Sequence, residues 1–563
     1  MNETVRNEVN VSSNSTWDQP SQLQAVPNPS PVPVKVQRTD TEATGRMKRN
    51  FPFFGGVTLV YAIFYAFCMF RNGSGVTFPF FMAGSLLYLC FSLSKLEISL
   101  KKGSWFYMIS VMLLAVSTFC TDDGRIIFFN KLGIFLLMIS LMLQQFFDTS
   151  QWKFGKYMGA ILELIFASMG ELGRPFSDAS VYMAQKEKRK DSKFWYMVLG
   201  VIIALPLLLV VWLLLNSADA VFRDMSSRLF GHINLQTIFS IAFRICFLYL
   251  ATYLLTAYLC KHEIKEEVKD KRNGEPVLAI TVTGMLSALY LVFSVIQIAG
   301  LFLGKMQLPE GYTYASYARE GFFQLLAVSI LNLIIVLLAM SFFKESRLLK
   351  AVLTVMSFCT FIMIASSALR MIIYIRYYYM TFLRILVLWG LGLLFFLFLG
   401  VVANIFAEKF PLFRYSMVVV TVLYLALSFS HPDYIIAKIN VANAPKGEST
   451  KITRTEDDFF QSSTLYHDYT YLSRLNADAA PVLIPYLEEL GYDMTLLERE
   501  DISNDIIIRM DREREGSRAS LKRSEQSDFG YYYLQQLQKM QKSFSWRTFN
   551  VSRYVALKQL ENN

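Results

Sequence analysis

The chain has 563 residues, 54% of them hydrophobic, and its mean hydropathy is +0.35. This composition is too apolar for a soluble globular protein and indicates a polytopic membrane protein. The net charge of +10 is uneven, because residues 431–563 carry 17 Lys/Arg against 20 Asp/Glu and the preceding residues carry +13. The excess lies in short loops between apolar runs, which suits the positive-inside bias of membrane proteins and argues against nucleic acid as a partner.

The first 50 residues are rich in Asn, Ser, Pro and Gln, and four alternate positions from Pro27 to Pro33 are proline. Such a composition buries too little apolar surface to fold, so we predict a disordered tail over residues 1–50. We do not expect a signal peptide, because the first apolar segment begins only near Phe51 and lacks a small-residue cleavage site.

Eleven apolar runs follow, each close to the roughly 20 residues that a membrane-spanning helix needs. They cover 51–70, 76–94, 104–120, 126–146, 194–216, 236–260, 277–303, 320–343, 351–374, 382–406 and 412–430. The sequence therefore predicts an all-α polytopic bundle of about eleven spans over residues 51–430.

Lysine and arginine are concentrated in alternate loops. One set of loops holds eight basic residues from Lys153 to Lys193 and five from Lys261 to Arg272. The opposite loops hold only scattered basic residues. Because basic loops stay in the cytoplasm, we predict a cytoplasmic N-terminus and an extracytoplasmic position for residues 431–563.

The long basic loop over residues 147–193 contains a mostly apolar stretch, Phe154–Met169, with Lys153 and Lys156 at its start. Either an interfacial amphipathic helix or a short buried helix fits this pattern. We expect Glu163, inside this stretch, to be paired or to face lipid headgroups rather than to be catalytic.

Beyond Ser430 charged residues become frequent, long apolar runs stop and helical periodicity appears. We predict one helix pair over Tyr466–Leu475 and Ala479–Leu490 and another over Tyr531–Lys542 and Phe549–Leu560. Residues 431–563 are therefore expected to form a small, all-helical extracytoplasmic domain.

Motifs for catalysis or metal binding are scarce. The six cysteines lie in or beside apolar runs without a CxxC pair, and the four histidines are far apart in sequence, so we expect no disulfide scaffold, metal site or cofactor. The sequence also contains no P-loop, GxSxG or HExxH motif, which leaves proteases, ATPases and metalloenzymes unsupported.

Charged residues near the predicted outer ends of the spans are the most informative feature. Arg244 lies inside the sixth predicted span, and Arg370 and Arg384 flank one outer turn. An arginine within a membrane is costly unless it snorkels, pairs or lines a polar cavity. Tyr374 follows Arg370 by four residues, which places both on one helix face.

Two interpretations of these charges stay open. They form structural ion pairs beside an aromatic belt, or they form an outward-facing pocket for an anionic ligand such as a phosphate or lipid headgroup, whose oxyanions match the arginine fork. On the second interpretation the ligand-binding residues are Arg244, Arg319, Arg370, Arg384, Asp219, Glu320, Tyr314 and Tyr374.

Several stretches between about residues 200 and 560 together resemble an uncharacterised bacterial membrane family, domain of unknown function 4173 and its relatives. The stretches are Ser217–Phe222, Tyr312–Phe323, Ser367–Arg370 with Tyr374, Thr381–Arg384, His431–Asp433 with Ile436–Asn440, Leu475–Pro481 and Phe549–Tyr554. The resemblance implies a bacterial cell membrane and names no reaction.

This chain departs from that pattern at two turns. The family has a glycine just before Thr381, where this chain has Tyr379 and Met380, and an asparagine before Pro432, where this chain has His431.

Our leading hypothesis is a non-enzymatic membrane protein that contacts membrane lipids and binds, transports or senses an anionic or amphipathic ligand. One alternative is an accessory or scaffold subunit whose outer domain docks a protein partner. The other is an envelope enzyme acting on lipid-linked substrates, with Asp219 or Glu320 as base and the arginines as oxyanion holders.

Overall fold

The computed structural model of the chain describes residues 41–149, 152, 154–186, 200, 235–261, 272–299, 314–407, 410–444, 471–490, 529–530, 532–541 and 545–562, with scattered residues between 204 and 225. For residues 314–320 it describes the backbone alone. Residues 1–40 of the predicted tail, much of the predicted span 194–216, and residues 466–470 of one predicted helix lie outside the described residues.

Nine helices within the described ranges are long and apolar enough to cross a membrane. They are η1 (Pro52–Val57) continued by α2 (Thr58–Met69), α3 (Thr77–Lys95), α5 (Gly124–Phe146), α10 (Leu235–Lys261), α11 (Pro276–Gln297), α12 (Tyr314–Phe342), α13 (Arg347–Tyr378), α14 (Phe382–Phe406) and α15 (Leu412–Phe429). The apolar helix α4 (Ser104–Cys120) is slightly shorter, with 17 residues. The predicted all-α polytopic bundle is confirmed, and the chain is a multi-pass integral membrane protein.

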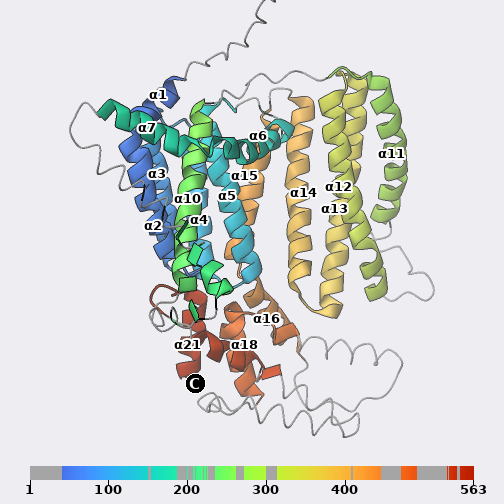
Figure 1. Cartoon of the computed structure of the whole chain (residues 1–563). Helices are drawn as coiled ribbons and strands as arrows, with labels where there is room; N and C mark the ends of the chain where they lie inside the picture. The colour runs from blue at the N-terminus through green and yellow to red at the C-terminus, as the bar shows by residue number, and fades with distance from the viewer. Residues whose placement is uncertain are drawn as a thin grey trace, which may run out of the picture. The chain divides into compact units, whose positions relative to one another are not determined.

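The spans pack as two neighbouring groups, α2–α5 with α10 and α11–α14, and α15 lies between them (Figure 1). Tyr424 of α15 donates its hydroxyl to Asn130 Oδ1 of α5 at 2.8 Å. On the other side, Trp389 Nε1 of α14 donates to the carbonyl of Leu423 at 2.9 Å. Helix α15 therefore joins the two groups through hydrogen bonds as well as apolar packing.

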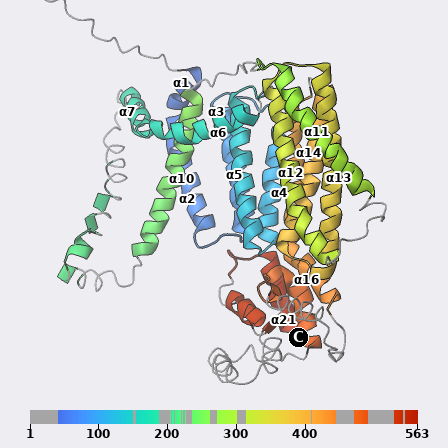
Figure 2. The same cartoon turned by 90° about the vertical axis from the view of Figure 1, so that its right-hand side faces the viewer.

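Three helices outside the spans lie at the end of the bundle where the lysine-rich loops occur: α1 (Glu42–Arg49), α6 (Phe154–Ala167) and α7 (Arg174–Lys186) (Figures 1 and 2). Helix α1 falls within the stretch expected to be disordered. It forms because the Thr41 side chain caps its first turn and because Met47 is buried against Tyr253 and Cys260 of α10.

A C-terminal helical unit lies at the opposite end of the spans (Figure 1). It comprises α16 (Pro432–Ala442), η4 (Ala477–Ala479), α18 (Ala480–Glu489), the helical residues 532–541 and α21 (Val551–Asn562). Its core is formed by buried side chains including Ile436, Leu483 and Tyr533. Helices α18 and α21 match the predicted helices over Ala479–Leu490 and Phe549–Leu560 closely.

The C-terminal helical unit is fastened to loops between the spans. Val76 donates its backbone N–H to the carbonyl of Phe549 at 2.8 Å. The Asn550 side chain donates to the carbonyls of Ser74 and Thr121 at 3.3 and 2.9 Å. Gly75 is needed here because a Cβ at that position would lie 2.3 Å from the backbone oxygen of Arg547. The loops after α2 and α4 therefore form the seat of the unit.

Candidate functional site

Arg370 on α13 is the only buried lysine or arginine among the residues with described side chains, with 6% of its surface exposed. Its Nη2 donates to Gln297 Oε1 of α11 at 3.3 Å. The same oxygen accepts a hydrogen bond from Ser366 Oγ at 2.7 Å, and Ser367 Oγ donates to the carbonyl of Phe322 of α12 at 3.1 Å. Polar groups of three spans therefore meet inside an otherwise apolar bundle.

The guanidinium of Arg370 lies directly against the backbone of α12. A Cβ added to Gly321 would stand 2.0 Å from Arg370 Nη1 and 2.9 Å from its Cζ. Any side chain other than hydrogen at this position would displace the guanidinium. Gly321 is therefore part of the site, although a glycine inside an apolar run carries no such signal in the sequence.

Tyr374 and Arg384 continue this arrangement towards the end of α13. The Tyr374 ring centroid lies 6.0 Å from that of Phe322, and the Arg384 guanidinium carbon lies 4.4 Å from the Tyr374 centroid. Arg384 Nη1 also donates to the backbone carbonyls of Tyr378 and Tyr379. A cation at a helix C-terminus is stabilising, so Arg384 caps the C-terminal end of α13. We call Gln297, Gly321, Arg370, Tyr374 and Arg384 the arginine group.

The other proposed site residues are not all brought to this group. Arg244 of α10 donates to the carbonyl of Met69 at 3.4 Å, because α10 packs mainly against α2. Asp219 is exposed, and its Oδ1 accepts backbone N–H groups of Val221 and Phe222. The described residues therefore do not bring all eight proposed residues together in a single pocket.

Three further proposed residues belong to the first turns of α12, immediately before Gly321. The backbone of Tyr314, Arg319 and Glu320 is helical, and their side chains lie outside the described structure.

The turn between α13 and α14 connects the arginine group to the C-terminal helical unit. Met380 donates its N–H to Asn440 Oδ1 at 2.7 Å and accepts from Asn440 Nδ2 at 3.0 Å. Phe382 donates its N–H to Tyr471 Oη at 2.9 Å. Tyr379 has φ +63°, a region that favours glycine, and the resemblance led us to expect a glycine here. A tyrosine therefore occupies this turn at the cost of backbone strain.

A second polar cluster lies where the C-terminal helical unit meets the spans, and Asp478 is its centre. The side chain of Asp478 is fully buried. It accepts hydrogen bonds from Thr121 Oγ1, from the Asp122 N–H at 3.0 Å and from Ser552 Oγ. His431 Nδ1 lies 3.5 Å from Asp478 Oδ2. One carboxylate therefore holds three separate segments together.

Three ion pairs lie around Asp478. Arg125 Nη2 lies 2.7 Å from Asp123 Oδ2 and 2.6 Å from Asp433 Oδ1. Arg553 Nε lies 2.6 Å from Asp122 Oδ1. We call these residues, with Asp478 and His431, the carboxylate junction. Sequence reasoning missed it because Thr121 and Asp478 are 357 residues apart and belong to unrelated-looking loops.

The environments of the junction carboxylates shift their pKa values in opposite directions. Burial raises the pKa of Asp433 to about 6, opposed by the charge of Arg125. Burial also raises the pKa of Asp122, opposed by Arg553. For Asp478 burial acts in the same direction, but hydrogen bonds from His431, Ser552 and Thr121 outweigh it and lower the pKa. The hydrogen bond to Asp478 raises the pKa of His431, while burial opposes it.

The chemistry of the junction is that of an anchor. The hydroxyls of Thr121 and Ser552 both donate to Asp478, so neither is arranged as a nucleophile activated by His431. The partner of His431 is Asp478, and not the neighbouring Asp433. Within the described ranges, no three His, Cys, Asp or Glu side chains form a group that could hold a metal ion.

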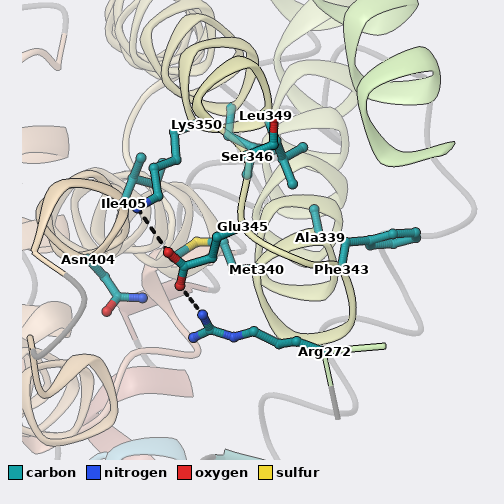
Figure 3. Close-up of a pocket in the computed structure, with 11 residues that line it drawn as sticks. Arg272, Ala339, Met340, Phe343, Glu345, Ser346, Leu349, Lys350, Asn404 and Ile405 are labelled. Atoms are coloured by element: carbon teal, nitrogen blue, oxygen red, sulfur yellow. Dashed lines mark hydrogen bonds and ion pairs between the residues drawn. The ribbon is translucent and has the colours of Figure 1, made fainter. Parts of the chain in front are cut away.

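A small cavity of about 40 Å³ lies at the lysine-rich ends of α12–α14 (Figure 3). Glu345 forms ion pairs there with Arg272 and, at 3.0 Å, with Lys350, and the Asn404 side chain lies beside them (Figure 3). This volume has room for only a few water molecules. The cavity is therefore too small for an organic ligand, and its ion pairs join the segment before α11 to the α12–α13 connection and the start of α13.

The family model described as Domain of unknown function (DUF4153) matches residues 108–486, from within α4 into α18. The match includes all of the arginine group and most of the carboxylate junction. It supports the uncharacterised family expected from the motifs, and it does not show domain of unknown function 4173 in particular. No curated protein and no solved structure matches the chain.

Proposed function

The chain belongs to the family of Domain of unknown function (DUF4153), and from that premise we propose that it binds an anionic ligand at the arginine group and senses it through its C-terminal helical unit. The observation that carries this proposal is the burial of the Arg370 guanidinium inside the spans. A buried intramembrane arginine is costly, and the planar fork of arginine suits phosphate and carboxylate oxygens.

The arrangement around Arg384 supports a sensing role. Arg384 stacks on Tyr374, one turn from Arg370, and holds the last carbonyls of α13. Asn440 holds the next residue of the same turn, Met380, from the C-terminal helical unit. A ligand that draws Arg384 away from these carbonyls would change the turn on which the unit rests.

We further propose that the ligand reaches the site from outside the cell. The described lysine-rich loop ends lie at one end of the spans and the C-terminal helical unit lies at the other (Figure 1). The positive-inside bias then places the N-terminus in the cytoplasm and the unit outside, in the cell membrane of a bacterium.

The test is ligand titration of the full chain in phosphatidylcholine discs, with inorganic phosphate and short-chain phosphatidylglycerol as probes. Hydrogen bonds to charged groups contribute about 1.5–3 kcal/mol, so Arg370→Gln should weaken binding by roughly ten- to a hundredfold. Arg376→Gln is the matched control, because Arg376 is exposed on the same helix. If Arg370→Gln and Arg384→Gln proteins fold and bind both probes like the parent, the proposal is wrong.

A second candidate function is an accessory subunit whose C-terminal helical unit docks a protein partner. The carboxylate junction favours it, because mutual pairing of Asp122, Asp433 and Asp478 with their cations holds the unit in one position on the spans. On this alternative, anion binding is absent and the arginine variants behave like the parent. The third hypothesis, an envelope enzyme, gains no such support, because the described hydrogen bonds of Asp219 are local.

A further inference from the structure

The loop after α5 is anchored to α10 by its acidic residues. Tyr258 donates its hydroxyl to Glu163 of α6 at 2.9 Å, and Tyr253 donates to Asp178 of α7 at 2.8 Å. Lys261, at the end of α10, pairs with Glu171 between the two helices. Every acidic residue from Phe154 to Lys186 is thus bound to α10.

Helix α6 has two apolar faces with different environments. Tyr157, Ala160, Ile161 and Leu164 are buried against the ends of α5 and α10. Four further apolar side chains occur at every fourth position and are exposed; they are Phe154, Met158, Leu162 and Phe166. Phe154 and Phe166 are 69% and 67% exposed. A spacing of four residues aligns them as one slowly winding stripe along the helix.

The depth of α6 places this stripe at a membrane boundary. The buried face of α6 packs on Leu143 and Phe147 at the end of α5 and on Leu259 near the end of α10. The helix runs across the spans instead of along them (Figures 1 and 2). The last turns of a span lie where hydrocarbon gives way to headgroups, which is the level that interfacial amphipathic helices occupy.

The charge of the segment is complementary to an anionic leaflet. Residues 153–193 contain eight Lys/Arg against five Asp/Glu, and three of those acids are the ones bound to α10. Lys156 lies in the first turn of α6, with its Nζ 5.6 Å from the Trp152 ring centroid. Basic residues near such a surface attract anionic headgroups.

We propose that α6 inserts its stripe of Phe154, Met158, Leu162 and Phe166 into the lipid leaflet at the lysine-rich ends of the spans and gathers anionic lipids there. The occupant of the exposed face is lipid of the same membrane, and neither a second copy of the chain nor another protein is required. The helix is then a lipid-contacting element separate from the arginine group.

Photocrosslinking of the full chain in vesicles tests whether lipid covers the exposed face of α6. The variant Phe154→p-benzoylphenylalanine, reconstituted in equal parts of phosphatidylglycerol and phosphatidylcholine, should form lipid adducts at a yield similar to Phe358→p-benzoylphenylalanine. Phe358 is an exposed residue in the middle of the span α13 and reports true lipid contact. Tyr554→p-benzoylphenylalanine, on α21 of the C-terminal helical unit, should form almost none. Mass spectrometry identifies each adduct.

The headgroup preference is read from the same adducts. Phosphatidylglycerol should be enriched over phosphatidylcholine at Phe154, and Lys156→Gln should reduce that enrichment by about fivefold, the effect of one basic residue near an anionic surface. Protein–protein adducts at Phe154, or a lipid yield as low as at Tyr554, would overturn the insertion. Equal capture of both lipids at Phe154 would overturn the anionic preference.

Discussion

The substitution Asp478→Asn probes the carboxylate junction with the smallest change of shape. At neutral pH the carboxylate is charged, because its hydrogen bonds hold its pKa below the usual value. Its Oδ1 accepts from Asp122 N–H and Ser552, and its Oδ2 from Thr121, with His431 at 3.5 Å. An asparagine keeps one acceptor oxygen and turns an NH₂ group towards the remaining donors.

The expected loss follows from these contacts. Two donors lose a charged acceptor, and each such hydrogen bond contributes about 1.5–3 kcal/mol. Removing one partner of a buried ion pair typically lowers the free energy of unfolding by about 3–5 kcal/mol. We therefore expect Asp478→Asn to destabilise the C-terminal helical unit by about 3–5 kcal/mol, a large part of the 5–15 kcal/mol that typically stabilises a folded domain.

Pulse proteolysis in urea, with the protein in lipid discs, measures this loss as a shift in the midpoint at which C-terminal fragments are released. Glu489→Gln is the control, because Glu489 is an exposed carboxylate on α18 of the same unit. Ser552→Ala removes one donor to Asp478 and replaces Asp478→Asn in the experiment if that variant does not fold. It should lower the free energy of unfolding by about 1–2 kcal/mol. Coincident midpoints for Asp478→Asn and Glu489→Gln would refute the reasoning.

Three further outcomes are expected. Because folding raises the pKa values of Asp433 (to about 6) and His431, their stabilising contribution is complete below the unfolded values of 3.8 and 6.5 and is lost as the pH rises through the folded ones. The urea midpoint should therefore fall as the pH rises from about 4 to 6 and fall further above 6.5. Gly321→Ala, with its methyl 2.0 Å from Arg370 Nη1, should weaken anion binding in the titration as strongly as Arg370→Gln. Tyr379→Gly should raise the free energy of unfolding by about 1 kcal/mol, seen as a higher urea midpoint, because glycine relieves the strain of a positive φ. An unchanged midpoint would mean that the turn is unstrained.

The spans were predictable because the signal for each is local. Runs of apolar residues specify helices whatever surrounds them. Every predicted run within the described residues overlaps a helix, and the run 194–216 lies largely outside them. Arg370 was found for the same reason, since a charge inside an apolar run stands out. The carboxylate junction was not, because Asp122, Asp433 and Asp478 each look like an ordinary surface residue until the loops are folded together.

The two positions that depart from the resembled family pattern share a backbone conformation that the sequence alone did not reveal. Tyr379 and His431, which replace an expected glycine and asparagine, both have positive φ, at +63° and +48°. Glycine and asparagine are the residues that adopt such conformations most easily. Both turns therefore hold a residue in a backbone conformation that glycine or asparagine adopts more easily.

The C-terminal helical unit is attached to the spans at two places, the carboxylate junction and the strained α13–α14 turn. At the carboxylate junction, buried Asp478 accepts hydrogen bonds from Thr121 and Asp122 beside the spans and from Ser552 of the C-terminal helical unit, so this contact resists change. At the α13–α14 turn, Asn440 and Arg384 hold a backbone strained at Tyr379. A ligand shifts a conformational equilibrium only through different contacts in its two states. If an anion competes for Arg384 as proposed, it changes such contacts at the turn and not at the junction, so movement of the unit should pivot on the junction.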